Sequence, residues 1–410
     1  MVWIDTLAAA AVLPGHCVLW ILFGNHNEAS SRPLRLRRLL KHISRVFALF
    51  IPGWYYGLGG LHLLSGLHSG TPLFAHAVYA AICIGLAIVF VAAGILGRRR
   101  VARLAARDVA SRRIHDLHGQ LVATSGNDAW SRWLLKVPGN QALQLEEVSK
   151  NMRLPRLPSE LDGLTIAHLS DLHFTGRIPK RFFDHVVDHT NAMDPDLTVI
   201  TGDILDSNAY ASWIPSTLGR LRARYGVYYV LGNHDVHPRI DSDHLRLMMS
   251  EAGIDPLGGR WQELTINGAQ IILAGNEMPW VPPAPDISDI PPRHADQVRI
   301  LLAHTPDISA WAQRHDFDLM LAGHTHGGQI ALPGIGAVVS PSRGPLEHVV
   351  GMIRLSPTLL HVSRGISGET PLRLNCRGEL AKLVLRSPQP TEQQTLSDYH
   401  QQERTKPLVH

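Results

Sequence analysis

"LTIAHLSDLH", residues 164–173, is a short apolar run that ends abruptly in an aspartate and a histidine. The same plan recurs four more times: a run of strand length is followed at once by residues that can bind a metal ion. These runs and endings are LTVITG with Asp203, VYYVLG with Asn233-His234-Asp235, RILLA with His304, and DLMLAG with His324-Thr325-His326. Because ligands bind beyond the carboxyl ends of strands in open α/β sheets, we expect these side chains to converge on one site.

The segments between these runs have the composition of polar helices. Residues 179–191 begin with Pro179, which suits the first turn of a helix, and residues 242–252 form a second candidate. Asn267-Gly268, between two apolar runs, is the signature of a hairpin. Strands that alternate with helices predict an α/β fold. After Ile330 the pattern changes to strands alone, in AVVS, MIRLS, LLHVSRG and LAKLVLR.

The residues at the strand ends have the chemistry of a metal site. Imidazoles and carboxylates together suit ions such as Mn, Fe and Zn. Two such ions about 3.5–4 Å apart can clamp both oxygens of a phosphoryl transfer. One carboxylate must bridge ions that lie so close, and Asp203 is the candidate. The glycines at 202, 232 and 323 allow tight turns that let the side chains converge. The spacing of His324 and His326 leaves open which ion each of them meets.

The ordered blocks DLH, GD, GNHD, H and GHTH between Asp171 and His326 resemble those of the calcineurin-like metallophosphoesterases. The resemblance implies an α/β fold in which a two-sheet β-sandwich is flanked by helices on both sides, a four-layer αββα arrangement, with a centre of two divalent metal ions. One ion would be held by Asp171, His173, Asp203 and His326, and the other by Asp203, Asn233, His304 and His324.

The same resemblance implies roles in catalysis. A hydroxide that bridges the metal ions would be the nucleophile. His234 would donate a proton to the leaving group or bind a phosphoryl oxygen, and Asp235 would orient His234.

Two longer stretches, GHTHGGQ and VSRGISGETPLRLNC, are similar to a membrane-attached bacterial subgroup that includes a UDP-2,3-diacylglucosamine diphosphatase of lipid A synthesis. The resemblance covers residues 162–386, which we expect to be the catalytic domain. Arg343, Arg364 and Arg373 are candidates for binding a diphosphate, since Arg makes bidentate contacts; surface salt bridges are the alternative. Trp280, in a proline-rich loop, would form a lid or meet an acyl chain, or would simply pack its own loop.

The N-terminal region, residues 1–113, has candidate membrane spans at 6–24, 46–68 and 73–97. The last is free of formal charge and is followed by Arg98-Arg99-Arg100. Basic residues on both sides of 46–97 predict a hairpin in a cell membrane, with the following domain on the cytoplasmic side. We interpret residues 114–161 as a helical linker and 387–410 as a disordered tail.

Two further features limit the functions considered. Residues 159–386 contain 19 Lys and Arg against 25 Asp and Glu, so we expect no nucleic-acid partner. The repeat DHVVDH at 184–189 lies on the predicted helix 179–191. Because phenylalanines and valines of that helix form an apolar stripe, we interpret its Asp and His residues as a face turned to water.

The sequence therefore predicts a membrane-anchored phosphohydrolase with two divalent ions, Mn, Fe or Zn. It would cleave a phosphoester or pyrophosphate bond, with a nucleotide-linked lipid precursor as the candidate substrate. The alternatives are a tethered protein or nucleotide phosphatase and a non-catalytic membrane scaffold with the same fold. The oligomeric state is left open.

Overall fold

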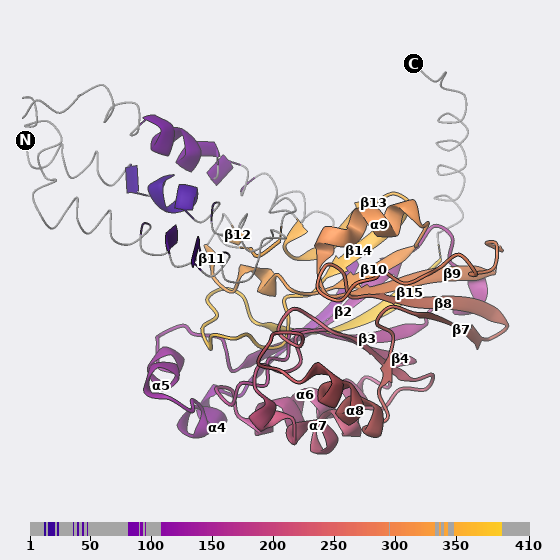
Figure 1. Cartoon of the computed structure of the whole chain (residues 1–410), viewed down its shortest axis with the longest axis horizontal. Helices are drawn as coiled ribbons and strands as arrows, with labels where there is room; N and C mark the ends of the chain where they lie inside the picture. Colours follow the sequence, from indigo (N-terminus) through magenta and orange to yellow (C-terminus); the bar gives the residue numbers. More distant parts are fainter. Residues whose placement is uncertain are drawn as a thin grey trace, which may run out of the picture. The chain divides into compact units, whose positions relative to one another are not determined.

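In this computed structural model the described residues are 108–294, 296–332, 336–337, 340–342 and 348–387, with scattered positions between 12 and 95. The chain divides into two compact units, residues 101–329 with 350–410 and residues 1–100 with 330–349. The first of these units contains the predicted catalytic domain, residues 162–386, except for residues 330–349 (Figure 1).

The larger unit is built on two sheets. Among its described residues, the first sheet has the strand order β1-β2-β15-β3-β4-β5-β6 and the second has β13-β14-β10-β9-β8-β7. The strands of the first sheet are β1 (Val109–Asp116), β2 (Gln144–Arg153), β3 (Thr165–Leu169), β4 (Leu197–Thr201), β5 (Val227–Val230), β6 (Asp255–Pro256) and β15 (Gly378–Arg386). Those of the second are β7 (Trp261–Ile266), β8 (Ala269–Asn276), β9 (Gln297–Ala303), β10 (Leu319–Ala322), β13 (Gly351–Leu355) and β14 (Thr358–Val362).

Helices cover the outer faces of both sheets. One face of the first sheet shares a core with α6, α7 and α8, and one face of the second sheet shares a core with α9. A third core fills the space between the sheets, where Ile166 and Val199 meet Ile271 and Ile300. The layers are therefore helix, sheet, sheet and helix, as the resemblance implied. The helices of this unit are α4 (His118–Leu121), α5 (Ala129–Leu135), α6 (Lys180–Ala192), α7 (Trp213–Ser216), α8 (Ser242–Glu251) and α9 (Ser309–Arg314).

The central strands are mostly apolar because both of their faces are covered, although β3 and β4 also bury His168, Thr198 and Thr201. In β4, Val199 points to the core between the sheets and Ile200 to the core beneath the helices. The strands β3, β4 and β5 are parallel, and so are β9 and β10, so their carboxyl ends carry the predicted ligands to one edge.

Several sequence predictions are confirmed. Helix α6 starts just after Pro179, and α8 is capped by the Asp241 side chain, which accepts a hydrogen bond from the His244 amide. The strands β7 and β8 form the predicted hairpin, with Asn267 and Gly268 at φ 52° and 87°. Positive φ at both positions is what a tight two-residue hairpin turn requires.

The predicted helical linker at 114–161 is wrong. Within it only α4 and α5 are helices of more than three residues, while β1 and β2 form one end of the first sheet, and β2 pairs in parallel with β15. The reason lies in Glu146 and Lys150, whose four-residue spacing is that of a solvated helix face. Both side chains are buried, next to Arg364 and Glu379 respectively.

The smaller unit is only partly described. Residues 81–89 are helical, and β11 (Ala331–Leu332) pairs with β12 (Gly336–Ala337). Among the described residues, no helix is both long and apolar enough to cross a membrane. Most of the predicted spans 6–24, 46–68 and 73–97, and residues 388–410 of the predicted tail, lie outside the described residues.

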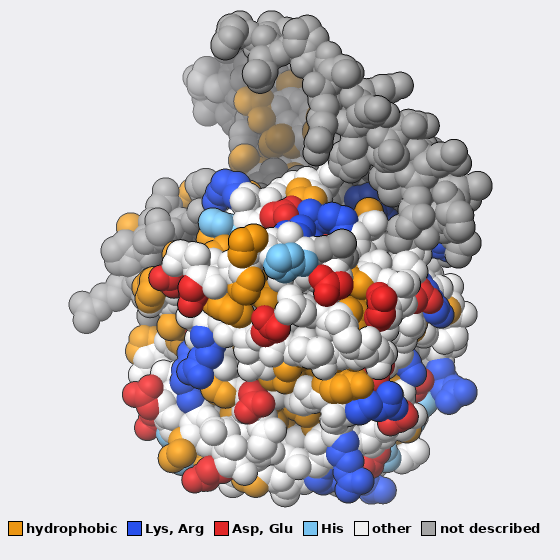
Figure 2. Space-filling view, turned by 90° about the vertical axis from the view of Figure 1, so that its right-hand side faces the viewer, with side chains coloured by type: hydrophobic (Ala, Val, Ile, Leu, Met, Phe, Trp, Pro, Cys, Tyr) orange, Lys and Arg blue, Asp and Glu red, His pale blue; other side chains and the backbone are white. Residues whose placement is uncertain are grey.

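Acidic and basic side chains are interspersed on the face of the molecule shown in Figure 2. The described residues on that face therefore form no broad field of a single sign, of the kind that steers a charged polymer to a surface.

Candidate metal centre

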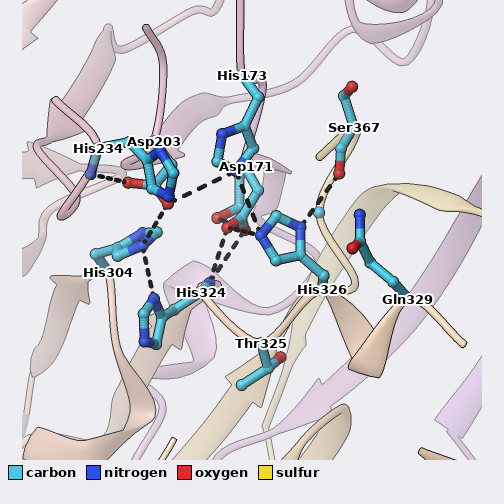
Figure 3. Close-up of polar contacts among 12 residues, drawn as sticks. Asp171, His173, Asp203, His234, His304, His324, Thr325, His326, Gln329 and Ser367 are labelled. Atoms are coloured by element: carbon cyan, nitrogen blue, oxygen red, sulfur yellow. Dashed lines mark hydrogen bonds and ion pairs between the residues drawn. The ribbon is translucent and has the colours of Figure 1, made fainter. Parts of the chain in front are cut away.

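Four loops that follow strands of the two sheets bring two clusters of ligand-type side chains together. One cluster contains Asp171, His173, Asp203 and His326, and the other contains Asp203, His304 and His324. Within each cluster the potential ligand atoms lie within 4.8 Å of one another. Asp203 belongs to both, and its Oδ2 lies 3.1 Å from His304 Nε2 and 3.6 Å from His173 Nε2 (Figure 3). One carboxylate oxygen thus stands between the clusters.

The backbone is strained where these side chains converge. Asp171, His173, Asp203, His324 and His326 all have φ between 48° and 70°. Non-glycine residues seldom adopt this left-handed region, although Asp and His tolerate it better than most. Such strain costs on the order of 1–3 kcal/mol per residue and gathers at functional sites.

Glycine at positions 232 and 323 is explained by the close approach of neighbouring atoms rather than by a tight turn of the backbone. A Cβ on Gly323 would lie 1.8 Å from Ser170 Oγ, and one on Gly232 would lie 2.2 Å from Asp203 Oδ1. Of the three glycines singled out in the sequence, Gly202 alone has a positive φ, 86°. The other two leave room for Asp171, Ser170 and Asp203.

The hydrogen bonds fix which histidine nitrogens face the centre. His173 Nδ1 donates to Asp206 at 2.7 Å, and His326 Nδ1 donates to the Ser367 carbonyl at 3.2 Å. With Nδ1 protonated in both neutral rings, the Nε2 atoms carry lone pairs, yet these two Nε2 atoms lie 3.3 Å apart. Two lone pairs at that distance repel unless a cation lies between them.

The second pair repeats this arrangement. His304 Nδ1 donates to the Thr201 carbonyl at 2.7 Å, so its Nε2 also carries a lone pair. That Nε2 is 3.2 Å from His324 Nδ1 and close to the Asp203 carboxylate. All of these side chains are buried or nearly so. The arrangement fits a bound cation on each side of Asp203.

The pKa values of the two histidines in each pair shift in opposite directions. Burial lowers the pKa of His304, but the Asp203 carboxylate outweighs it and raises the pKa to about 9. Burial and the neighbouring His304 lower the pKa of His324 to about 3. In the other cluster the pKa of His173 is raised, while burial and His173 lower that of His326. Each pair therefore favours a single proton over two.

Asn233 supplies an independent observation. Its Oδ1 is buried and has no hydrogen-bond partner among the residues that the structure describes. Buried polar atoms are nearly always paired, so an orphaned carbonyl oxygen calls for an explanation. The adjacent His234 amide donates to Asp203 Oδ1 at 2.8 Å, which holds this turn against the bridging carboxylate. The amide oxygen of Asn233 fits the ligand role that the sequence resemblance implied for it.

Asp206 is a functional residue that the sequence reasoning missed. Its two oxygens accept from His173 Nδ1 and His234 Nδ1. Burial raises the pKa of Asp206, but His173 and His234 outweigh it and hold the pKa well below its usual range. Burial lowers the pKa of His234, but Asp203 and Asp206 raise it to about 10. The sequence signal for Asp206 was the second aspartate in TGDILD, residues 201–206. It was missed because, unlike the candidate ligands, Asp206 does not directly follow one of the strand-length apolar runs.

Asp235 has different partners from those expected. Its carboxylate accepts from the backbone amides of Gly232, Ile204 and Leu205 at 2.8–2.9 Å, and it is fully buried. Asp206, rather than Asp235, is therefore the carboxylate beside His234 Nδ1. Asp235 instead ties the loop after β4 to the loop after β5.

The predicted substrate arginines also have other partners. Arg373 is 1% exposed, and its guanidinium donates to the carbonyls of Arg364, Gly365, Ser367 and Cys376. Arg364 forms ion pairs with Glu146 and Glu379. These contacts replace the expected substrate contact because both guanidinium groups are already engaged inside the protein. Arg343 lies outside the described residues.

Trp280 lies beside the second cluster. Its ring centroid is 5.1 Å from that of His324 and 5.4 Å from that of His304. The proline-rich loop therefore brings an aromatic wall to the metal centre, and the ring does more than pack its own loop.

The chain is similar in sequence to proteins of known family. The sequence profile of calcineurin-like phosphoesterases matches residues 164–328. A bovine (Bos taurus) "transmembrane protein with metallophosphoesterase domain" is 32% identical over 250 residues, 57% of this chain and 55% of that protein. The metallophosphoesterase YkuE of Bacillus subtilis is 30% identical over 257 residues, 59% of this chain and 86% of that protein. Phosphodiesterase YaeI of Escherichia coli is 29% identical over 223 residues, 54% of this chain and 81% of that protein.

Proposed function

The chain belongs to the calcineurin-like phosphoesterase family, whose members are metal-dependent phosphoester hydrolases, and on that premise we propose that it binds two divalent ions that share Asp203. The observation that carries the proposal is the pair of facing imidazole nitrogens on each side of one buried carboxylate, at 3.2 and 3.3 Å. Mn, Fe and Zn suit this mixture of nitrogen and oxygen ligands. Asp171, His173 and His326 would complete one site, and Asn233, His304 and His324 the other.

When bound, the two ions would activate a water molecule and neutralise charge on the phosphoryl group. The remaining chemistry belongs to the side chains around them. His234 is held by Asp206 through Nδ1, which leaves its Nε2 for a substrate, and its side chain is 29% exposed. We assign to His234 Nε2 the proton that goes to the leaving oxygen. Trp280 forms the wall against which the leaving group lies.

For the substrate we propose a phosphodiester or diphosphate at a membrane surface, with a nucleotide-linked lipid precursor as the leading candidate. The E. coli relative is named a phosphodiesterase and the bovine relative a transmembrane protein, and both names support this choice. The uncharged stretch 73–97 and the arginines after it support a membrane anchor with the catalytic domain on the cytoplasmic side. These features suit a lipid-linked substrate better than a soluble phosphoprotein.

Hydrolysis by the full-length protein tests the proposal. With Mn²⁺ supplied, the wild type should cleave bis(p-nitrophenyl) phosphate, and Asp203→Asn should lose at least about 1000-fold of the rate. Loss of a charge shared by both ions removes several kcal/mol of transition-state stabilisation, and each 1.4 kcal/mol is tenfold. Asp243→Asn, an exposed carboxylate at the start of α8, is the matched control. Normal turnover by Asp203→Asn would contradict the assignment, and a wild type without metal or turnover would favour a scaffold.

A second comparison addresses the substrate. Full-length protein in vesicles should hydrolyse a nucleotide-linked lipid with a higher kcat/KM than it shows for a soluble nucleotide diester. Equal or lower values for the lipid would favour a tethered nucleotide phosphatase.

A further inference from the structure

A second cluster of metal-binding side chains lies on the first sheet and shares no residue with the centre described above. It consists of His115 on β1, Glu147 on β2 and His189 on α6. His115 Nε2 is 2.9 Å from Glu147 Oε2, and His189 Nδ1 is 3.7 Å from the same oxygen. The two imidazole rings have centroids 3.8 Å apart. Three elements that are distant in sequence thus present three ligand atoms to one point.

The sheet register explains how His115 and Glu147 meet. In the antiparallel pair β1–β2, His115 lies opposite Leu145, and Arg113 lies opposite Glu147. Residues two apart share a face of a strand, so His115 and Glu147 are diagonal neighbours on one face. Leu145 belongs to the core that includes the apolar side of α6, so α6 covers that face. His189, near the end of α6, reaches the two side chains from above the sheet.

This placement changes the interpretation of the DHVVDH repeat. His189 does not simply face water: its side chain is 30% exposed, and its ring lies against that of His115 at an interplanar angle of 38°. Asp184 and Asp188 do behave as predicted for a polar face, because both pair with Arg220. His185, one helical turn before His189, has a buried Nε2 with no hydrogen-bond partner among the described residues.

A hydrogen bond from His115 to Glu147 accounts for only part of this arrangement. His189 Nδ1 approaches the same oxygen at a distance too long for a hydrogen bond. A metal ion about 2.1 Å from each of three tetrahedral ligands places the ligand atoms roughly 3.4 Å apart. The distances 2.9 and 3.7 Å lie on either side of that value. Small side-chain rotations would convert the cluster into a coordination site.

The charge of the ligand set also suits a cation. Two imidazole ligands and one carboxylate together would carry one negative charge. Arg113, on the same face of β1, and His185, on α6, also act on His189, while Asp184 and Asp188 pair with Arg220. All three side chains of the cluster are partly exposed, so water can fill the remaining coordination position.

We propose that His115, Glu147 and His189 form a second metal site, specific for a divalent transition ion of the zinc type. Two imidazoles and one carboxylate, with an open position, are a recurrent ligand set for zinc. Magnesium and calcium prefer oxygen ligands and would bind here poorly. The ion would fasten β1, an edge strand with an otherwise exposed surface, to α6. The role of the ion would be to secure the first strand of the larger unit. This proposal does not depend on the proposed catalytic function.

Zinc content of the full-length protein tests this proposal. The variants are His115→Ala/His189→Ala, the milder Glu147→Gln, and His244→Ala as a matched control, since His244 is an exposed histidine outside the cluster. After saturation with Zn²⁺ and removal of free ion, elemental analysis should show about one zinc per chain fewer in the double variant than in the wild type or His244→Ala. Glu147→Gln should weaken the corresponding zinc affinity at least tenfold, in line with the effects of changes around metal sites.

A second readout separates loss of the site from misfolding and from failure of the catalytic proposal. Amide hydrogen exchange in residues 109–116 should slow when Zn²⁺ is added to the wild type and should not change in Glu147→Gln. Mn²⁺-dependent hydrolysis should be equal in the two proteins. Equal zinc contents in the wild type, Glu147→Gln and the double variant would overturn the proposal, whatever the hydrolysis assay gives.

Discussion

Asp206→Asn is the most informative single substitution near the metal centre, because one carboxylate serves two histidines. Asp206 accepts from His173 Nδ1 at 2.7 Å and from His234 Nδ1. Asparagine offers one acceptor and one donor in the same space, so only one of the two histidines keeps its hydrogen bond. If His173 loses it, the Nδ1 proton can move to Nε2, the atom that faces the metal. If His234 loses it, the proton donor loses its anionic partner.

The expected magnitude follows from the kind of bond that is lost. A hydrogen bond to a charged group contributes about 1.5–3 kcal/mol, and every 1.4 kcal/mol is a factor of ten. Asp206→Asn should therefore lower kcat/KM for an aryl phosphodiester by roughly 10- to 150-fold. Some of that loss should appear as a higher Mn²⁺ concentration for half-maximal activity, since supporting partners of ligand histidines affect metal affinity 10- to 100-fold.

The assay is a Mn²⁺ titration of initial rates with purified full-length protein, with Asp243→Asn as the control. Asp206→Asn should shift both the Mn²⁺ requirement and kcat, whereas Asp243→Asn should shift neither. A variant with the Mn²⁺ requirement and kcat of the wild type would refute the role given to Asp206. A fall in kcat with an unchanged Mn²⁺ requirement would place the loss at His234 rather than at His173.

Three further predictions concern the buried ion pairs, a crowded glycine and the aromatic wall. Glu379→Gln should lower the free energy of unfolding by about 3–5 kcal/mol in urea at pH 7, because it leaves buried cations without their partner. Burial raises the pKa of Glu379, but its cationic partners hold that pKa well below 4.5, so this stabilisation is present above pH 4.5 and should be lost as the pH falls below it. Gly323→Ala would place a Cβ 1.8 Å from Ser170 Oγ and should reduce hydrolysis at least tenfold, while Gly119→Ala, which meets nothing within 4 Å, should not. Trp280→Ala should raise KM for an aryl substrate by roughly 2- to 10-fold with metal content unchanged, because an aromatic contact contributes about 0.5–1.5 kcal/mol. An unchanged KM would show that Trp280 does not contact the leaving group.

The strands that carry the metal ligands could be predicted because each is covered on both faces. An uninterrupted apolar run followed at once by Asp or His leaves little ambiguity about where the strand ends. Helix α6 was equally clear, since Pro179 marks its start. Order and spacing of these signals indicated an α/β fold and one shared site, whereas the four layers and the two ligand sets were implied only by the resemblance to calcineurin-like metallophosphoesterases.

The features that could not be predicted depend on contacts between distant segments. Lys150 and Glu146 resemble a solvated helical pair until Glu379 and Arg364, more than 200 residues later, are seen to neutralise them inside the sheet. In the same way, Arg373 resembled a substrate ligand because nothing local indicates that it is buried among backbone carbonyls. Polar residues in a core depend on their partners, and single-sequence patterns do not reveal partners.

Anomalous diffraction from crystals of the full-length protein grown with Mn²⁺ is the most direct test of the central claim. Two peaks should flank Asp203 Oδ2, about 3.5–4 Å apart. One should lie between His173 Nε2 and His326 Nε2, and the other between His304 Nε2 and His324 Nδ1. A single peak, or peaks that do not share Asp203, would contradict a centre of two bridged ions.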